Sequence, residues 1–197
     1  MPAPPLPRLV LASSSVYRRE LLARLRIDFE THSPDVDESP CAGEAPAALA
    51  LRLACAKAAA VAKRIPHALI IGSDQVAMCG ARELAKPGNH AAAKRQLRDM
   101  SGQTITFYTA ICLLNAATGG RQTAVVPVTV AMRTLDDVQI DRYLAVDQPY
   151  DCAGSARIEA FGITLVEKIG GDDPNALIGL PLIELCKMLR NEGFELP

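Results

Sequence analysis

Leu69-Ile70-Ile71-Gly72-Ser73-Asp74-Gln75-Val76 is the stretch that decides the fold. The apolar run over residues 68–71 is bounded by Gly-Ser-Asp, a pattern typical of a buried strand that ends in a turn. The pattern predicts that Asp74 lies where a central strand leaves the sheet, at the edge where open α/β sheets bind ligands. Asp74 is therefore the first candidate for chemistry. The alternative is an aspartate that only hydrogen-bonds to the backbone of its own turn.

The composition indicates a globular chain with a large core. The chain has 197 residues, 49% of them hydrophobic, and this length suits one large or two small domains. The formal net charge of -1 argues against a non-specific nucleic-acid binder, so we expect no nucleic-acid partner. The three histidines lie far apart, which disfavours a histidine triad or metal cluster. The six cysteines have no zinc-type spacing, and we expect thiols buried in a reducing cytosol: Cys41, Cys55, Cys79, Cys112, Cys152 and Cys186.

The sequence gives no signal for secretion or for a membrane span. Residues 1–7 are rich in proline and lack the basic start and long apolar core of a signal peptide. No apolar run approaches the roughly 20 residues that cross a bilayer. We therefore expect a cytoplasmic protein with no membrane partner.

The N-terminal segment combines a short strand, a polar loop and a helix. An apolar run over residues 9–12 is followed by three serines (residues 13–15) and then by a helical pattern. This order directs unpaired N–H groups at an anion. Arg18 lies on the apolar face that continues through Leu21 and Leu25, where a charge needs an anionic partner. Phosphate binding explains the pattern, and so does a serine cap beside an arginine whose head reaches solvent.

A second cation falls on a buried face in the next predicted helix, over residues 46–63. Lys57 continues the apolar stripe of this helix. The preceding segment, residues 33–43, is an acidic loop that contains Glu38. Because a core does not readily accept two unpaired cations, Arg18 and Lys57 together indicate a buried anion.

The remaining pattern predicts a mixed α/β fold. We expect an extended segment at residues 76–79, Lys86 held extended before Pro87, a glycine-rich turn over residues 170–179 and a loop over residues 149–160 that holds Glu159. Predicted helices cover residues 90–100 (capped by Asn89), 134–145 and 182–191, and predicted strands cover residues 104–115, 122–133 and 161–169. These elements favour a mixed, partly parallel sheet with helices on both faces. Since no linker is visible, we expect a single domain over residues 1–197, bilobed around a central cleft.

Six polar residues stand in unusual places: Ser13, Arg18, Glu38, Lys57, Asp74 and Lys86. Three cations and two carboxylates suit a polyphosphate bound with a divalent metal, Mg²⁺ or Mn²⁺. The cations would offset phosphate charge, and one carboxylate would activate water. The G-x-x-x-x-G-K-[ST] pattern is absent from the sequence, so the chain is not a P-loop enzyme.

The sequence resembles the Maf family of nucleoside triphosphate pyrophosphatases from near Leu9 to near Arg190. The motifs that carry the resemblance are Leu11-Ala12-Ser13-Ser14-Ser15 with Arg18-Arg19-Glu20-Leu21-Leu22, Val36-Asp37-Glu38, Arg52-Leu53-Ala54 with Lys57-Ala58, Gly72-Ser73-Asp74, Lys86-Pro87, Ser101-Gly102-Gln103, Ala153-Gly154-Ser155 and Gly179-Leu180-Pro181-Leu182. Their order along the chain makes chance agreement improbable.

The resemblance implies hydrolysis of a nucleoside triphosphate to the monophosphate and pyrophosphate. It implies a divalent metal held by Glu38 and Asp74, with Asp74 as the proton acceptor. The residues that it implies for catalysis are Asp74, Lys57 and Lys86, and those for substrate binding include Ser13, Arg18 and Arg19.

Three further positions resemble the branch of the family that hydrolyses 7-methylguanosine triphosphate: Tyr17, Gln75 and Glu159. The N7-methylated base is cationic, so the aromatic face of Tyr17 could stack on it. Glu159 could accept hydrogen bonds from N1 and the exocyclic amine of guanine. The alternatives are a surface aromatic residue at Tyr17 and a solvated loop acid at Glu159.

Two other functions remain open at this point. The same reaction could act on thymidine, uridine or unmodified purine triphosphates. A nucleotide-binding regulator of septum formation is the alternative from another class. The sequence also leaves open the metal, and whether the protein forms a homodimer.

Overall fold

The computed structural model describes residues 6–197, so the first residues of the proline-rich segment lie outside the described part. The strands are β1 (Arg8–Ala12), β2 (Glu30–Thr31), β3 (Ala68–Cys79), β4 (Arg82–Glu83), β5 (Thr104–Asn115), β6 (Arg121–Met132) and β7 (Val166–Gly170). The α-helices are α1 (Val16–Ala23), α2 (Pro46–Ala62), α3 (His90–Met100), α4 (Asp137–Asp147), α5 (Pro174–Ile178) and α6 (Leu182–Asn191). Two 3₁₀ helices, η1 (Ala153–Ser155) and η2 (Phe161–Leu165), complete the described elements.

The strands form one sheet of mixed direction, in the order β2-β1-β3-β5-β6-β7 with β4 beside β3. β1 pairs in parallel with β2 and β3, whereas β4 on β3 and β7 on β6 are antiparallel. This confirms the predicted mixed, partly parallel α/β sheet.

The chain divides into two compact units. Unit 1 contains the chain up to Gln75 together with Thr109–Val126 and Asp173–Pro197, and unit 2 contains Val76–Tyr108 and Pro127–Asp172. The long strands β3, β5 and β6 contribute residues to both units.

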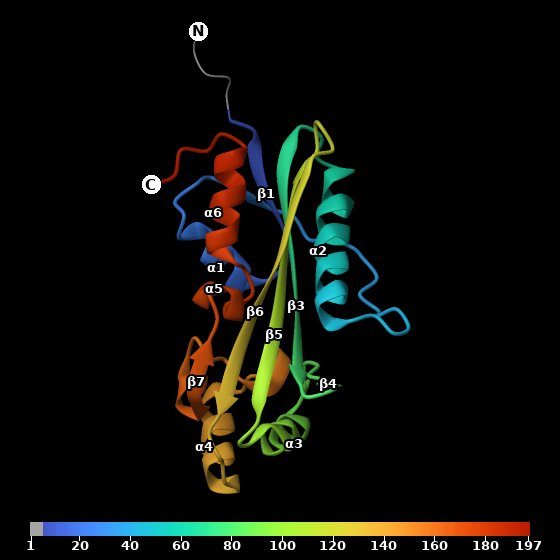
Figure 1. The fold of residues 1–197 in the computed structure, drawn as a ribbon. Helices are drawn as coiled ribbons and strands as arrows, with labels where there is room; N and C mark the ends of the chain where they lie inside the picture. Colours follow the sequence, from blue (N-terminus) through green and yellow to red (C-terminus); the bar gives the residue numbers. More distant parts are fainter. Residues whose placement is uncertain (1–5) are drawn as a thin grey trace. The chain divides into compact units, whose positions relative to one another are not determined.

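Unit 1 has helices on both faces of its part of the sheet (Figure 1). On one face, α1 and α6 bury leucines such as Leu21 and Leu185 in a core with Leu69 and Ile71 of β3. Side chains alternate along a strand, so Gly72 faces the other side, where it meets α2. Alternation therefore places Asp74 on the α2 face as well.

Unit 2 holds α3, with its predicted Asn89 cap, and α4, which begins at Asp137 rather than at the predicted residue 134. The Asn89 side chain accepts a hydrogen bond from the backbone N of Ala92 at the start of α3. α4 begins with a capping box between Asp136 and Gln139. Ion pairs between Lys94 and Asp141 and between Arg98 and Asp137 join the two helices.

Three local predictions are wrong. β3 does not end at Gly72-Ser73-Asp74 but continues to Cys79. Within the strand, the side chain of Ser73 bonds to the carbonyl oxygen of Ala110, and that of Asp74 bonds to Lys57. The predicted strand over residues 161–169 begins as η2, where Gly162 fits so closely that a Cβ would lie 2.5 Å from the carbonyl oxygen of Arg157. The glycine-rich turn after β7 contains the short helix α5.

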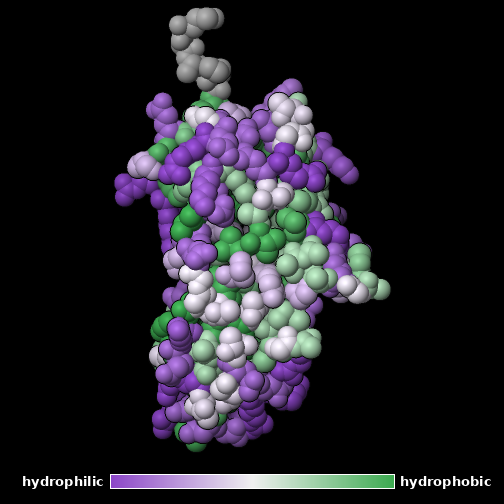
Figure 2. Space-filling model, viewed as in Figure 1, coloured by the Kyte–Doolittle hydropathy of each residue, from purple (hydrophilic) through white to green (hydrophobic). Residues whose placement is uncertain are grey.

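Within residues 6–197, no helix is long and apolar enough to cross a membrane. On the face drawn in Figure 2, hydrophobic residues lie among hydrophilic ones.

Our expectation of uniformly buried thiols is wrong, because Cys112 is the buried cysteine and the other five are partly or fully exposed.

Gly72 is predicted to be indispensable for the packing of α2 on β3. A Cβ at this position would lie 2.1 Å from the carbonyl oxygen of Ala54 and 2.9 Å from the backbone N of Ala58, so neither neighbour can move independently of the helix. Gly72→Ala should lower the free energy of unfolding by about 3 kcal/mol or more, at the upper end for overpacked cores. Urea denaturation measures the loss.

Gly43→Ala is the matched control, because Gly43 has a positive φ but open space around it. Only the left-handed backbone penalty of about 1 kcal/mol applies there. Equal losses in the two variants would refute the close-packing role of Gly72.

Candidate active site

A lysine and two carboxylates form the centre of the site, and we call Lys57, Asp74 and Glu38 the Lys57 cluster. Lys57 Nζ lies 2.5 Å from Asp74 Oδ1 and 2.6 Å from Glu38 Oε1. The side chains of Lys57 and Asp74 are only 8% and 10% exposed, whereas that of Glu38 is 61% exposed. The cluster therefore joins a buried ion pair to a carboxylate at the surface.

The positions of the cluster follow from the elements that carry its residues. Lys57 lies on α2 one turn after Ala54, and Asp74 lies on β3 two residues after Gly72. Gly72 lets α2 approach the strand closely, so that the lysine reaches the carboxylate. The sequence prediction that Lys57 occupies a buried face next to an anion is confirmed.

Arg18 is the second cation of the site, and the residue taken as a whole is half-buried. Its Nε donates to the carbonyl oxygen of Gly179, at 2.8 Å. Burial lowers the pKa of Arg18, while the charges of Asp74 and Glu38 act in the opposite direction. Across residues 6–197, Arg18 has no carboxylate within ion-pair distance.

The carbonyl that holds Arg18 is itself fixed by β3. The Ser73 hydroxyl, fully buried, lies 2.9 Å from the oxygen of Gly179 and 2.8 Å from that of Ala110. Gly179 has a φ of +122°, and a Cβ there would lie 3.4 Å from Arg18 Nε. This turn therefore cradles the arginine side chain.

Gln75 has a structural role in addition to the one predicted for it. Its Nε2 lies 2.8 Å from Thr109 Oγ1 and 2.9 and 3.0 Å from the carbonyl oxygens of Ala176 and Leu177 in α5. Thr109 donates in turn to Ala176. The amide of Gln75 thus anchors α5 to β3.

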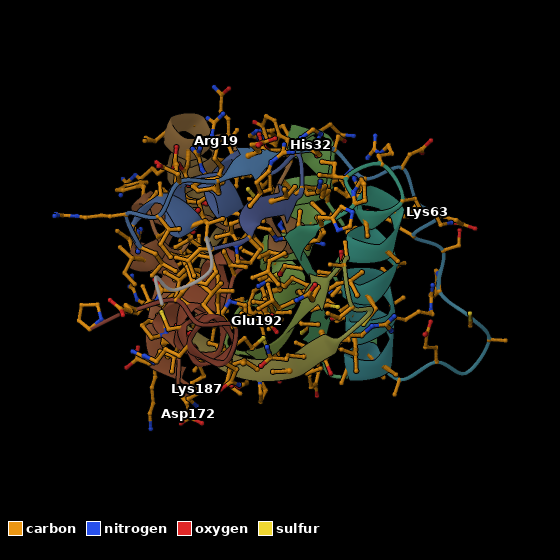
Figure 3. The ribbon with its side chains drawn as sticks, turned by 90° about the horizontal axis from the view of Figure 1, so that it is seen from above. Arg19, His32, Lys63, Asp172, Lys187 and Glu192 are labelled. Atoms are coloured by element: carbon orange, nitrogen blue, oxygen red, sulfur yellow. The ribbon has the colours of Figure 1, made fainter. Side chains whose placement is uncertain are left out.

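The start of α1 shows the serine cap that the sequence left as an alternative. The Ser15 side chain accepts a hydrogen bond from the backbone N of Arg18 at 3.3 Å. Ser13 is buried, and its hydroxyl accepts from the backbone N of Ser15 at 3.1 Å. Tyr17 is half-buried, whereas Arg19 is exposed and lies on the outside of the molecule (Figure 3).

Unit 2 carries the other two candidates, Lys86 and Glu159, and both residues are exposed. Lys86 precedes Pro87 between β4 and α3. Glu159 follows Arg157, whose guanidinium forms an ion pair with Asp147.

A buried network holds the segment of Glu159 in place. Tyr143 Oη donates to Asp147 Oδ2 at 2.7 Å and accepts from the backbone N of Arg157 at 3.0 Å. The ring of Tyr143 also stacks on Phe161, with 6.1 Å between centroids. Desolvation raises the pKa of Glu159, opposed in part by the charge of Arg157.

The carboxylates of Glu38 and Asp74 are suited to hold a divalent metal if a bound substrate supplies the remaining ligands. Glu38 and Asp74 bring carboxylate oxygens to one cationic group, the ammonium of Lys57. Mg²⁺ is commonly held by one or two carboxylates plus substrate phosphates. No group of three or more His, Cys, Asp or Glu side chains in residues 6–197 could hold a metal without such help.

Sequence reasoning missed the organising role of Asp173. This buried aspartate caps α5 by accepting from the backbone N of Asn175 at 2.9 Å, and accepts from the backbone N of Ile183 in α6 at 2.7 Å. The Asp-Pro-Asn sequence that begins at Asp173 indicated a turn. It did not indicate the second hydrogen bond of Asp173, from the backbone N of Ile183 ten residues further on.

The chain is similar to known proteins along almost its whole length. The family model described as "Maf-like protein" matches residues 8–192. A protein of Cupriavidus pinatubonensis named "7-methyl-GTP pyrophosphatase" is 55% identical over 194 residues, which cover 98% of each chain. Proteins of the same name are 55% identical in Thiobacillus denitrificans, over 96% of this chain and 94% of the relative, and 53% identical in Nitrosococcus oceani, over 98% of each chain.

The coupling of Lys57 to Asp74 can be measured in a double-mutant cycle. Lys57→Met leaves Asp74 as an unpaired buried carboxylate and should lower the free energy of unfolding by about 3–5 kcal/mol. Adding Asp74→Asn should restore most of that loss, because the unpaired charge is removed.

Lys63→Met is the control at the residue that directly follows α2, since Lys63 is exposed and points away from the protein in Figure 3. It should change stability by less than about 0.5 kcal/mol. Strictly additive effects of Lys57→Met and Asp74→Asn would contradict the pairing.

Proposed function

This chain belongs to the Maf family, and we propose that it hydrolyses 7-methyl-GTP to 7-methyl-GMP and pyrophosphate. The observation that carries the proposal is the Lys57 cluster in a chain whose relatives of 51–55% identity bear the name 7-methyl-GTP pyrophosphatase. A buried carboxylate beside cations is the arrangement that water attack on a phosphoric anhydride requires.

Asp74 acts as the proton acceptor in this proposal. The attacking water gives its proton to the Asp74 carboxylate, and its oxygen bonds to phosphorus. The anhydride bond between the α- and β-phosphates breaks, and pyrophosphate leaves. The ammonium of Lys57, at 2.5 Å, keeps the carboxylate oriented before the attack.

Three cations offset the charge of the triphosphate. Lys57 is paired with Asp74, and Arg18 is within reach of the charges of Asp74 and Glu38. The proposal adds Lys86 as the third cation. The guanidinium of Arg18 is suited to this role, because desolvation favours an anionic ligand. A divalent metal, when bound by Asp74 and Glu38, supplies Lewis-acid stabilisation of phosphate oxygens.

Recognition of the base rests on Tyr17 and Glu159. A cationic 7-methylguanine favours an aromatic face, which Tyr17 offers from α1. A carboxylate at Glu159 can accept hydrogen bonds from N1 and the exocyclic amine. The buried network of Tyr143 and Asp147 supports the backbone that carries Glu159.

Replacing the proton acceptor should separate chemistry from binding. Asp74→Asn should lower kcat by about 10²-fold or more while substrate still binds, since general-base catalysis is lost. Pyrophosphate release measures kcat, and calorimetry measures binding. Asp37→Asn, an exposed change next to Glu38, is the control and should leave kcat within about 2-fold. Near-normal turnover in Asp74→Asn would remove this residue from the mechanism.

The base can be tested with a panel of 7-methyl-GTP, GTP and UTP. Tyr17→Ala should reduce kcat/KM for 7-methyl-GTP about 2- to 30-fold more than for GTP, equivalent to about 0.5–2 kcal/mol of cation–π stabilisation. Glu159→Gln should impair both guanine nucleotides and leave UTP nearly unchanged. Equal losses on all three nucleotides would mean that Tyr17 and Glu159 do not read the base.

A further inference from the structure

The backbone that carries Glu159 forms a tightly closed turn in unit 2, and we call residues 157–162 the Glu159 turn. The carbonyl oxygen of Arg157 accepts hydrogen bonds from the backbone N of Ala160 and of Gly162, both at 3.0 Å. The closure needs glycine at its end, because a Cβ on Gly162 would lie 2.5 Å from that same oxygen. Glu159 itself is exposed. The turn thus holds an accessible carboxylate on a closed backbone.

The hydroxyl of Tyr143 fastens this turn to α4. Tyr143 is buried, and its Oη accepts from the backbone N of Arg157 at 3.0 Å. The same oxygen donates at 2.7 Å to Oδ2 of Asp147, four residues later on the helix. The other carboxylate oxygen of Asp147 accepts from the guanidinium of Arg157. Both the backbone and the side chain of Arg157 are therefore fixed, two residues before Glu159.

The hydroxyl and the ring of Tyr143 contribute separately to this arrangement. The ring stacks on Phe161 at the far end of the Glu159 turn, with 6.1 Å between centroids. That contact needs only an aromatic ring. The hydroxyl uses both its donor and its acceptor capacity on polar partners, as a buried phenol must if it is not to cost stability. A satisfied buried network of this kind rigidifies the segment that it holds.

We propose that Tyr143 is a positioning residue for Glu159 and that its hydroxyl sets the preference for guanine over pyrimidine nucleotides. This inference rests on the proposed function, in which the Glu159 carboxylate accepts hydrogen bonds from N1 and the exocyclic amine of the base. Two simultaneous hydrogen bonds require the carboxylate to be held within about 0.5 Å of the productive geometry. Without its anchor at Arg157, the Glu159 turn loses that precision.

The test is Tyr143→Phe, which keeps the ring and removes both hydrogen bonds of the hydroxyl. We expect kcat/KM for 7-methyl-GTP and GTP to fall about 5- to 10-fold, the scale of one net hydrogen bond, mainly through KM. The value for UTP should stay within about 2-fold, because the phosphate chemistry is untouched. Steady-state pyrophosphate release measures all three, and thermal melting verifies that the variant is folded.

A double-mutant cycle with Glu159→Gln shows whether Tyr143 acts through Glu159. In the Glu159→Gln background, Tyr143→Phe should change kcat/KM for guanine nucleotides by less than about 2-fold, because the contact that it positions is already lost. Tyr150→Phe is the matched control, since the Tyr150 hydroxyl also lies between α4 and the turn in sequence but contacts His90 Nδ1, at 3.1 Å. It should leave all three values within about 2-fold.

The outcomes separate this inference from the proposed function. Equal losses on all three nucleotides in Tyr143→Phe, or a full additional loss in the Glu159→Gln background, would show a structural role and overturn the inference. Unchanged selectivity in Tyr143→Phe, with guanine nucleotides impaired in Glu159→Gln, would overturn the inference and leave the proposed base recognition intact. Unchanged selectivity in both variants would overturn the base recognition as well.

Discussion

The ion pair between Lys57 and Asp74 is the interaction on which the rest of the site depends. Its atoms lie 2.5 Å apart and both side chains are nearly buried. A buried pair of this kind seldom adds net stability, because desolvating two charges offsets most of their attraction. Its presence between α2 and β3 is therefore better explained by chemistry than by folding. An aspartate held in position by an ammonium can accept a proton from water while the phosphate charge is balanced next to it.

The ion pair depends on the close approach of α2 to β3. Gly72 lets α2 come near enough to β3 for Lys57 to reach Asp74. On the opposite face of the same strand, Ser73 and the carbonyl of Gly179 hold Arg18. The consecutive residues Ser73 and Asp74 thus organise the two faces of the sheet, which explains why β3 continues where a turn was expected.

Several helices, and the positions of the two cations of the site, were predictable from the sequence. Periodicity located α2, α3 and α6, and it identified Lys57 as a charge on a buried face. It also placed Arg18 on the apolar stripe of α1, where the structure leaves it half-buried. The partners of these residues were not predictable, because Asp74 on β3 and Gly179 before α6 meet them only through tertiary packing. The helical turns of η2 and α5 were missed for a related reason, since they depend on contacts of Gly162 and Asp173 with distant backbone.

A crystal structure with a non-hydrolysable analogue of 7-methyl-GTP and Mg²⁺ tests the central claim most directly. The account predicts that phosphate oxygens of the analogue contact Lys57 and Arg18 and that Asp74 adjoins the scissile anhydride. An analogue bound away from Asp74, with the Lys57–Asp74 pair and the Arg18–Gly179 hydrogen bond as they are now, would contradict it.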